Sequence, residues 1–488
     1  YDNNMALSMS RYMILLCLLT VVGCRETDET KGSEKPNIVF ILVDDLSKEW
    51  VSHYGAEDIE TPNVDKLAES GMTFHNFYSM PQCTPTRLSF LTAEYPFSHG
   101  WVNHWDVPRW GGGAHYDEKL NPTLIPKIKE AGYKTAIAGK WQIDDFRVEP
   151  DALTKIGFDE YCMWTGWEEG IPASAERYQN PYLFSGKSAS HTYSNAFGPD
   201  IFTKFITDFI EESKDEPFFV YYPMVLTHTP FVNTPDEQAP NKLGKHKAMV
   251  RYTDKITGQI VEALEKAKVR DNTIIVWTTD NGTTGQVSGR LNGRMVKGGK
   301  GGTKESGINQ PFIVSWPSHI KPGHETEALI DITDLLPTFV DLVNPASLPD
   351  HSKLGGRSFK NLLTGVSIDS ERSWILGMGG KNNARLTEEG VENQYVYRDR
   401  VLRDKRFKLC ISTNGSPEAF YDLKEDPSED KNLLGILEGQ EQKMSYKKLM
   451  EVAAQFPKED NEPKYEPNAA QEWDVAVTAE SKVWKKNN

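Results

Sequence analysis

The chain has 488 residues and a formal net charge of −15, from 70 acidic and 55 basic side chains. Its hydrophobic content of 38% is enough for the core of one large domain with a smaller one, or of two comparable domains. The acidic balance argues against a nucleic-acid-binding protein, because a phosphate backbone is normally met by clustered Lys and Arg. Five cysteines are too few for a disulfide framework in a chain of this length.

The first 35 residues have the pattern of an export leader. Arg11 precedes an apolar run that ends at Cys24, and a polar stretch follows. The run is too short to span a bilayer. Val21 to Gly23, just before Cys24, resemble a bacterial lipobox, so we expect residues 1–35 to be a lipoprotein-type signal and tether. This predicts an exported, periplasmic or cell-surface lipoprotein anchored through Cys24; an ordinary secretory signal is the alternative.

From Pro36 onwards, strand and helix patterns alternate. The apolar run Asn37 to Val43 predicts a buried strand, and the segment from Thr61 to Gly71 predicts a helix with a cap, an early proline and a stop. Further helices are expected at 123–133, 200–213 and 248–269, and further strands at 134–143, 217–225 and 272–282. This alternation predicts an α/β fold with a large mixed, mostly parallel sheet sandwiched by helices.

The pattern changes near Gly365. Shorter strand candidates follow at 395–402 and 406–411, and acidic turn residues come after them. We therefore expect an α/β domain over 36–365 and a smaller C-terminal α+β subdomain over 366–488, built on a short antiparallel sheet and ending in a tail.

Polar residues follow the ends of two predicted strands. Asp44 and Asp45 come after the first, and Asp280 and Asn281 come after another. Ligands collect at the carboxyl ends of parallel strands. Adjacent buried carboxylates repel each other unless a cation compensates them, and an oxygen-only set suits Ca²⁺ or Mg²⁺ and not zinc. The alternative is a helix cap and a plain turn, which need no ion.

Cys83 stands apart from the other cysteines because it lies in a polar, proline-punctuated segment, "CTPTR". A Cys-x-Pro-x-Arg pattern arises by chance in roughly one chain in a hundred of this length. With "GYKTAIAGKW" (132–141) and further matches along nearly the whole globular part, the sequence resembles the type I, formylglycine-dependent sulfatases of the alkaline-phosphatase superfamily.

The resemblance implies an alkaline-phosphatase-like fold and sulfatase activity. A formylglycine-generating enzyme would convert Cys83 to Cα-formylglycine (3-oxoalanine), whose hydrate attacks the sulfur of a sulfate ester; the second hydroxyl then lets sulfate leave. Ca²⁺, in preference to Mg²⁺, would be held by Asp44, Asp45, Asp280, Asn281 and residue 83.

The resemblance also assigns roles to four basic residues. Lys140 and Lys300 match the lysines that bind sulfate, and Arg87 matches the arginine that holds the hydrate and its turn. His228 matches the histidine that, with Lys300, assists the departing alcohol as a general acid.

One position departs from the family pattern. The family usually has Gly-Lys-Trp-His, whereas this chain has Gln142 in place of the histidine. We expect Lys140, Gln142 and Asp144 to share one face of a strand. Glutamine can form a hydrogen bond to the hydrate but cannot act as a base at neutral pH. Sulfate release would then rely on solvent or on another base, with Asp144, His104 and His115 as candidates.

The segment 100–119, between the two signatures, is rich in Trp, His, Arg and Gly. Aromatic platforms with polar partners suit sugar rings, so we expect a sulfated carbohydrate as substrate, contacted by Gln142, His104, Arg109 and His115. A second insert, 166–187, could line the rim of the pocket. A structural loop with buried tryptophans is the alternative. The rival functions are a phosphomonoester or phosphonate hydrolase of the same superfamily and a non-catalytic lipoprotein that binds sulfated glycans.

Overall fold

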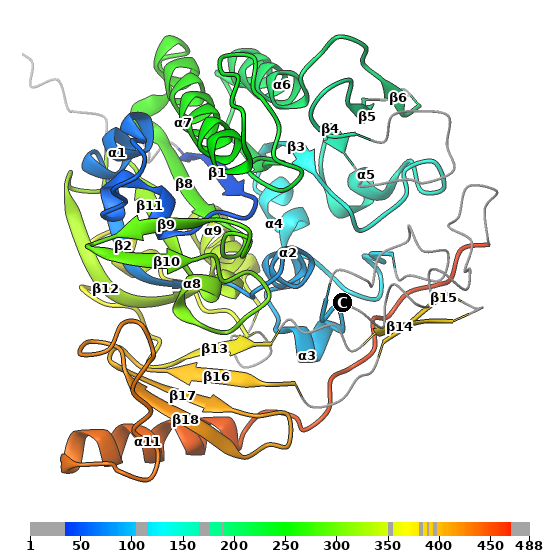
Figure 1. The fold of residues 1–488 in the computed structure, drawn as a ribbon. Coiled ribbons are helices and arrows are strands. Elements are labelled where there is room, and N and C mark those ends of the chain that lie inside the picture. Colours follow the sequence, from blue (N-terminus) through cyan, green and yellow to red (C-terminus); the bar gives the residue numbers. More distant parts are fainter. Residues whose placement is uncertain are drawn as a thin grey trace, which may run out of the picture. The chain divides into compact units, whose positions relative to one another are not determined.

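The computed structural model describes residues 35–103, 115–164, 176–186, 189–349, 355–379, 384–387, 390–393 and 398–469 (Figure 1). Within these residues, no helix combines the length and the apolar character needed to cross a membrane. The leader and Cys24 lie outside the described residues.

The main element is a mixed sheet whose ten described strands run in the order β12-β2-β11-β8-β1-β7-β3-β4-β5-β6. The central run from β8 to β4 is parallel. The strands are β1 (Asn37–Val43), β2 (Met72–Tyr78), β3 (Lys134–Lys140), β4 (Glu160–Trp164), β5 (Tyr182–Ser185), β6 (His191–Thr192), β7 (Phe218–Pro223), β8 (Thr273–Thr279), β11 (Asn309–Ser315) and β12 (His324–Asp331).

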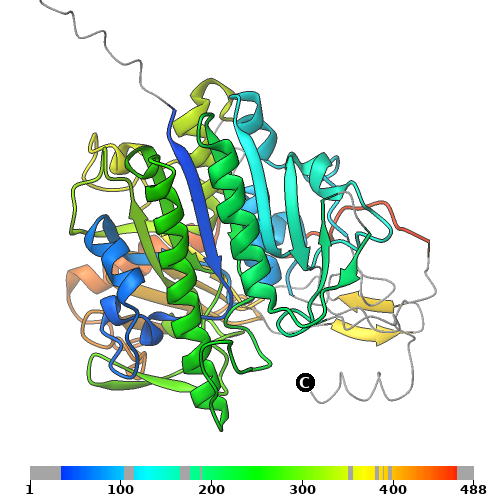
Figure 2. The same ribbon diagram turned by 90° about the horizontal axis from the view of Figure 1, so that it is seen from above.

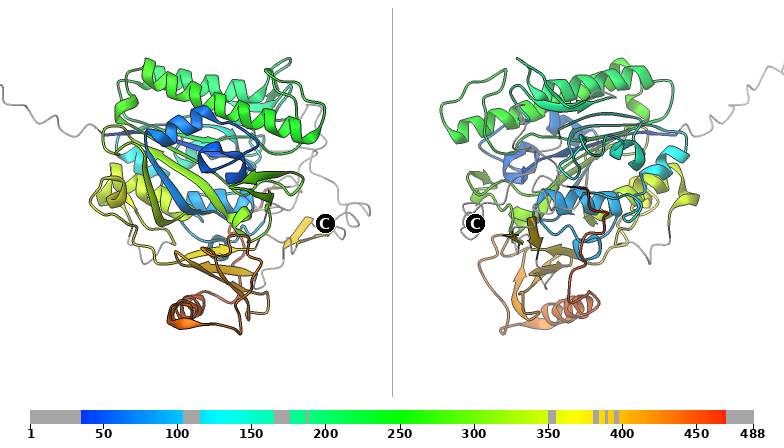
Figure 3. Two further views of the ribbon diagram at one scale, coloured as in Figure 1. Left: turned by 60° about the vertical axis from the view of Figure 1, so that its left-hand side comes forward. Right: turned by 90° about the vertical axis from the view of Figure 1, so that its right-hand side faces the viewer.

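Helices cover both faces of this sheet (Figures 2 and 3). One layer comprises α1 (Pro62–Glu69), α6 (Gly198–Ser213) and α7 (Lys242–Lys266). The other comprises α2 (Cys83–Thr92), α4 (Ile125–Glu130), α5 (Ala152–Ile156), α9 (Leu335–Val343) and α10 (Lys360–Leu363). Alternate residues of β1 divide between the layers, since Phe40 packs with the second and Ile41 with the first. This period-two burial on both faces explains why the whole strand is apolar.

The expected α/β fold is confirmed. β1 spans the predicted residues, and the sheet is mixed because β11 runs antiparallel to both of its neighbours, β2 and β8. The strand predicted at 134–143 ends at Lys140, which matters for the site.

The C-terminal part has its own four-stranded antiparallel sheet, β13-β16-β17-β18, packed on α11 (Figure 1). Its elements are β13 (Ile375–Met378), β16 (Arg400–Arg403), β17 (Phe407–Ile411), β18 (Pro417–Asp422) and α11 (Gly439–Ala453). Smaller elements are β9 (Ser288–Leu291), β10 (Arg294–Lys297), β14 (Ala384–Thr387), β15 (Gly390–Asn393), α3 (Pro96–His99) and α8 (Glu305–Ile308). Short 3₁₀ helices lie at Lys48–Trp50, Ser52–Tyr54, Arg270–Asn272, Ile332–Asp334 and Pro345–Ser347. The predicted antiparallel C-terminal sheet is thus confirmed.

A buried cation joins this small sheet to the loop that precedes α8. Lys408 of β17 has a fully buried side chain, and its Nζ lies 3.2 Å from Glu305 Oε1 and 2.6 Å from Glu429 Oε1. The same Nζ donates to Thr303 O at 2.6 Å. The C-terminal sheet therefore fixes the segment that follows Lys300.

Replacing Lys408 with methionine should destabilise the fold by about 3–5 kcal/mol, because it leaves the buried Glu429 without its cation and removes one of the two cations that pair with Glu305. Urea unfolding measures this change. The matched control is Lys447→Met, since that side chain is 79% exposed, and its change should stay within about 0.5 kcal/mol. Equal effects at the two positions would contradict the structural role of Lys408.

The segment 460–469 runs along the loops after α3 (red in the right-hand view of Figure 3). Asn461 N donates to Phe97 O at 2.8 Å, and Asn121 Nδ2 donates to Lys464 O at 2.7 Å. These contacts connect the end of the described chain to the segment between the two sequence signatures.

Candidate active site

Four buried polar residues meet at the carboxyl ends of β1 and β8. Val43 is paired with Thr279 at the end of the two parallel strands, so the residues that follow are neighbours. Asn281 Nδ2 donates to Asp45 Oδ1 at 2.7 Å, and Asp45 N donates to Asp280 Oδ1 at 3.1 Å. The structure thus brings together the four side chains that the sequence places at strand ends: Asp44, Asp45, Asp280 and Asn281.

Cys83 lies beside these carboxylates. It is the first residue of α2 and is 4% exposed. Ligand atoms of Asp44, Cys83 and Asp280 all lie within 4.8 Å of one another. The proline of "CTPTR" occupies the first turn of the helix, where no backbone donor is needed. The thiol is therefore held at a helix start that faces the acidic cluster.

Arg87 lies one turn after Cys83 on α2 and binds the cluster from that side. Its Nη2 and Nε donate to Asp280 Oδ2 at 2.7 and 3.1 Å. Burial lowers the pKa of Arg87, but the charges of Asp280 and Asp44 outweigh it and raise the pKa overall. Burial and the charge of Asp44 also raise the pKa of Asp280. Arg87 is a permanent cation that fixes one carboxylate of the site.

Two lysines balance the other two acids. Lys140 Nζ lies 2.7 Å from Asp44 Oδ2, and both side chains are fully buried. Lys300 Nζ donates to Asp45 Oδ2 at 2.7 Å, and its side chain is 22% exposed. The loop of Lys300 approaches another backbone segment closely, because a Cβ at Gly298 would lie 2.2 Å from Thr284 O. Glycine is therefore required there.

His228 follows β7 and faces the same acids from the solvent side. Its Nε2 lies 3.7 Å from Asp45 Oδ2, and its side chain is 20% exposed. Nδ1 lies 2.6 Å from Thr229 O, which can only accept, so Nδ1 carries the proton. Burial and the charge of Lys300 lower the pKa of His228. The ring is thus oriented with Nε2 towards the site.

Gln142 reaches the site by a turn and not by a strand. Its Oε1 lies 4.0 Å from Cys83 Sγ, and its φ of 73° is left-handed. The expectation that Lys140, Gln142 and Asp144 share one strand face is wrong, because β3 ends at Lys140 and the chain turns. Asp144 instead accepts from Trp141 Nε1 at 2.6 Å and from Tyr116 N at 2.8 Å.

His115 belongs to a neighbouring cluster. Its Nδ1 lies 3.0 Å from Glu149 Oε1 and 4.0 Å from Asp144 Oδ1, and its Nε2 lies 2.6 Å from Glu466 O. His115 therefore holds the C-terminal segment 460–469 against the turn that carries Gln142. His104 and Arg109, the other predicted substrate contacts, lie outside the described residues.

This cluster predicts a pH-dependent contribution to stability. Burial lowers the pKa of His115, but hydrogen bonds to Glu149 and Glu466 outweigh it and raise the pKa to about 9. Because this value lies above the unfolded value of about 6.5, the stabilisation is complete below pH 6.5 and is lost as the pH rises through about 9. As the pH rises between these two values, the melting temperature of His115→Gln should fall less than that of the wild type. Thermal unfolding scans across this pH range measure the difference. Parallel curves would contradict the assignment.

The acidic cluster offers oxygen ligands for a cation. Asp44 Oδ1 and Asn281 Oδ1 are buried and have no hydrogen-bond partner, and both are oxygens at the acidic cluster. A buried polar atom without a partner is costly, whereas a hard cation would satisfy both. The residues present therefore fit a divalent ion that prefers oxygen ligands.

Two further residues support the site without having been predicted from the sequence. Thr86 Oγ1 donates to Asp280 O at 2.8 Å and so joins α2 to the end of β8. Tyr178 OH lies 2.6 Å from His228 O and 2.7 Å from Val225 O. Thr86 could have been found inside "CTPTR", whereas Tyr178 lies in the second insert, where no local pattern points to His228.

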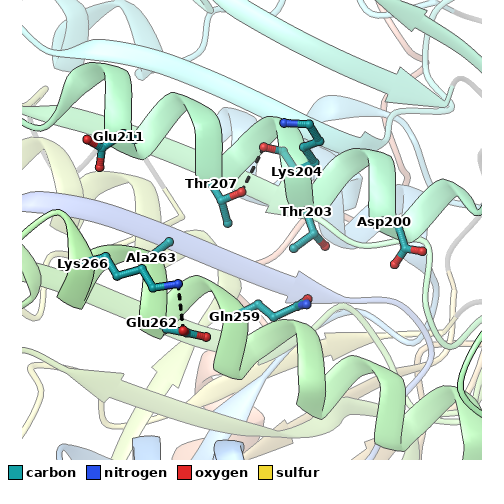
Figure 4. A pocket seen from close by; sticks show the side chains of 9 residues that line it. All are labelled: Asp200, Thr203, Lys204, Thr207, Glu211, Gln259, Glu262, Ala263 and Lys266. Carbon is teal, nitrogen blue, oxygen red and sulfur yellow. Dashed lines mark hydrogen bonds and ion pairs between the residues drawn. The ribbon is translucent and has the colours of Figure 1, made fainter.

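A separate groove of about 550 Å³ lies between α6 and α7 (Figure 4). Its lining side chains include an ion pair on α7, Lys266 Nζ to Glu262 Oε1 at 2.9 Å, and none of them belongs to the cluster around Cys83. The chemistry of the strand ends is thus distinct from this helical surface.

Residues 36–345 match the family model described as Sulfatase. The chain belongs to the sulfatase family. Residues 300–455 also match the model of the N-sulphoglucosamine sulphohydrolase C-terminal region. This protein is therefore a sulfuric ester hydrolase, as its strand-end cluster and "CTPTR" predict.

This sulfatase is similar to named sulfatases over most of its length. It is 29% identical to N-acetylgalactosamine-6-O-sulfatase from Bacteroides thetaiotaomicron, with 87% of this chain and 96% of the relative covered. It is 30% identical to human N-acetylgalactosamine-6-sulfatase, with 69% and 67% covered. The crystal structure of Ps i-CgsB in complex with k-i-k-neocarrahexaose shares its fold, with a TM-score of 0.69, 23% identity, and 93% and 98% covered.

Proposed function

We propose that this sulfatase hydrolyses sulfate esters of a carbohydrate, with a formylglycine hydrate made from Cys83 as nucleophile and a bound divalent cation, Ca²⁺ in preference to Mg²⁺. The observation that carries the proposal is the position of Cys83, whose Sγ lies within 4.8 Å of ligand oxygens of Asp44 and Asp280. Burying a thiol among carboxylates is unfavourable for folding, so the position of Cys83 supports a role in catalysis.

Two groups beyond the encoded side chains complete the proposed chemistry. The formylglycine hydrate supplies a hydroxyl nucleophile and a second hydroxyl that permits release of sulfate. The cation, held by the cluster of strand-end residues and residue 83, stabilises negative charge on the sulfate oxygens. Maturation then requires a formylglycine-generating enzyme as partner.

The basic side chains bind and orient the ester. Lys300, whose side chain is 22% exposed, and Lys140, which is buried against Asp44, bind oxygens of the sulfate. Arg87 keeps Asp280 and the start of α2 in place. His228, which Tyr178 and Thr229 hold in place, assists the departing alcohol together with Lys300, and it gives up a proton from Nε2 only in the imidazolium form, in which both ring nitrogens carry one.

Gln142 orients residue 83 by a hydrogen bond but cannot take a proton from it. We therefore expect proton removal during sulfate release to use solvent or another base. Rapid-quench kinetics tests this: steady turnover after the first equivalent of alcohol is expected. One equivalent followed by arrest would show that the absence of the usual histidine is disabling.

A sulfated sugar is the proposed substrate class. Curated relatives are named N-acetylgalactosamine-6-sulfatases, and a structural neighbour binds a neocarrahexaose. The test is ion chromatography of sulfate released from defined sulfated oligosaccharides by protein co-expressed with a formylglycine-generating enzyme. Release from at least one sugar is expected. Cleavage of aryl sulfates alone would overturn the substrate class, and faster cleavage of matched phosphate esters would favour a phosphohydrolase.

We also propose that the protein is an exported lipoprotein anchored through Cys24. The sequence before that residue supports this, as described above. Membrane fractionation of the native host should find the protein in the membrane pellet, and Cys24→Ala should release it. Equal distribution of both forms in the soluble fraction would contradict the anchor.

A further inference from the structure

Arg177 lies in the second insert and stacks on an aromatic residue at the edge of the site. Its guanidinium carbon is 4.1 Å from the ring centroid of Trp164. Trp164 ends β4, where it is the register partner of Lys140 on β3. Trp141 N donates to Trp164 O at 2.7 Å. The indole is therefore fixed next to the strand end that carries Lys140 and the turn that carries Gln142.

Arg177 is connected to the His228 segment through its neighbour Tyr178. The next residue, Tyr178, has its hydroxyl 2.6 Å from His228 O. Gly198 N donates to Tyr178 O at 2.7 Å, and a Cβ at Gly198 would lie only 2.1 Å from Arg177 O. Such a close approach requires glycine and leaves the backbone little freedom. The backbone of Arg177 therefore lies between Lys140, which is assigned to sulfate binding, and His228, which is assigned to the leaving alcohol.

The guanidinium of Arg177 forms no ion pair with the residues that the structure describes. Each of the other cations in the cluster, Arg87, Lys140 and Lys300, has a carboxylate oxygen within 2.7 Å. Among the described residues, no carboxylate forms a salt bridge with Arg177, and its Nη1 is buried without a hydrogen-bond partner. A planar guanidinium matches two oxygens of a sulfate or carboxylate, and stacking on an indole fixes its plane.

We propose that Arg177, stacked on Trp164 beside His228, binds a second anionic group of the sugar substrate, either a further sulfate ester or a carboxylate. This inference rests on the proposed function. It narrows the substrate class to saccharides with two anionic groups, one at the scissile position and one on the alcohol side. A purely structural arginine on Trp164 would contribute packing alone and would not distinguish substrates by their charge.

The test compares kcat/KM for three sugars: a 6-sulfated N-acetylgalactosamine, the same sugar with a second sulfate, and a disaccharide in which it is joined to a uronic acid. The variants are Arg177→Gln, which keeps a flat side chain without charge, and Arg177→Lys, which keeps the charge. The control is Arg251→Gln, an arginine 44% exposed on α7 and paired with Glu237. Melting temperatures are measured for every variant.

For Arg177→Gln we expect kcat/KM to fall roughly 10–100-fold on the preferred doubly anionic sugar, mostly through KM, and less than about threefold on the monosulfated sugar. Arg177→Lys should recover part of the loss, and Arg251→Gln should resemble the wild type. Loss on the disulfated sugar alone identifies a sulfate as the second group, and loss on the uronate alone identifies a carboxylate.

Equal losses on all three sugars, no loss on any, or a wild type that shows no preference for doubly anionic sugars would each overturn the inference. If Arg177→Gln unfolds, Arg177→Lys decides: a charge-based site keeps its preference for the doubly anionic sugar, and loss of that preference in the folded variant overturns it. Failure of the wild type to cleave the monosulfated sugar or any other sulfate ester refutes the proposed function separately.

Discussion

A Cys83→Ala variant should release sulfate at least about a thousandfold more slowly than the wild type, while its melting temperature stays close to the wild-type value. Residue 83 is the one side chain in the cluster that can supply the attacking group, and alanine removes it without adding volume. The side chain lies at the start of α2, where the helix itself does not depend on the thiol. Ion chromatography of sulfate and thermal unfolding measure the two quantities.

The matched control for this variant is Cys410→Ala. Cys410 is a free cysteine on β17, in the C-terminal sheet. Replacing Cys410 should leave the rate of sulfate release within about twofold of the wild-type rate, because Cys410 lies in the C-terminal sheet and not in the acidic cluster. A Cys83→Ala protein that still turns over at a tenth of the wild-type rate would show that residue 83 is not the nucleophile.

Removal of the divalent ion should be the second large effect. Asp44, Asp45 and Asp280 lie together without exposure to solvent, and two buried oxygens of the cluster have no protein partner. Without the ion these two oxygens stay buried without a partner, so a chelator should abolish activity and remove roughly 3 kcal/mol of stability relative to protein in Ca²⁺ at a hundred times its Kd. Metal analysis, sulfate release and thermal unfolding measured on the same samples would show this.

Asn281→Leu offers a sharper version of the same test. The change deletes one candidate ligand oxygen and preserves most of the volume, so we expect the activity of the variant to require roughly 10–100-fold more Ca²⁺ than the wild type. The matched control is Asn361→Leu, because Asn361 is exposed on α10 and lies outside the cluster; its Ca²⁺ requirement should equal that of the wild type. Full activity in a sample shown to be free of metal would contradict a role for the ion.

Much of the site could be predicted because its residues follow strands that are recognisable locally. Asn37–Val43 is an apolar run buried on both faces, so the position of Asp44 and Asp45 at its end follows directly. The same reasoning places Asp280 and Asn281 after β8. Parallel pairing of the two strands, which are far apart in the sequence, then brings the four residues together in the fold.

Other features depend on contacts that local patterns do not contain. The alternation of residues after Lys140 suggests that the strand continues, but Gln142 takes a left-handed conformation and turns the chain. The antiparallel insertion of β11 between β2 and β8 is set by pairing across long separations. Arg177 and Lys408 look like ordinary polar residues in the sequence, and only the fold places an indole beside the first and two carboxylates beside the second.

In the proposed mechanism, residue 83 acts as an aldehyde hydrate. Mass spectrometry of the tryptic peptide ending at Arg87, taken from preparations that contain different amounts of formylglycine-generating enzyme, tests it most directly. The fraction of the peptide carrying the aldehyde should rise in proportion to the sulfate-release activity of each preparation. A fully active preparation in which position 83 is entirely thiol would contradict the account.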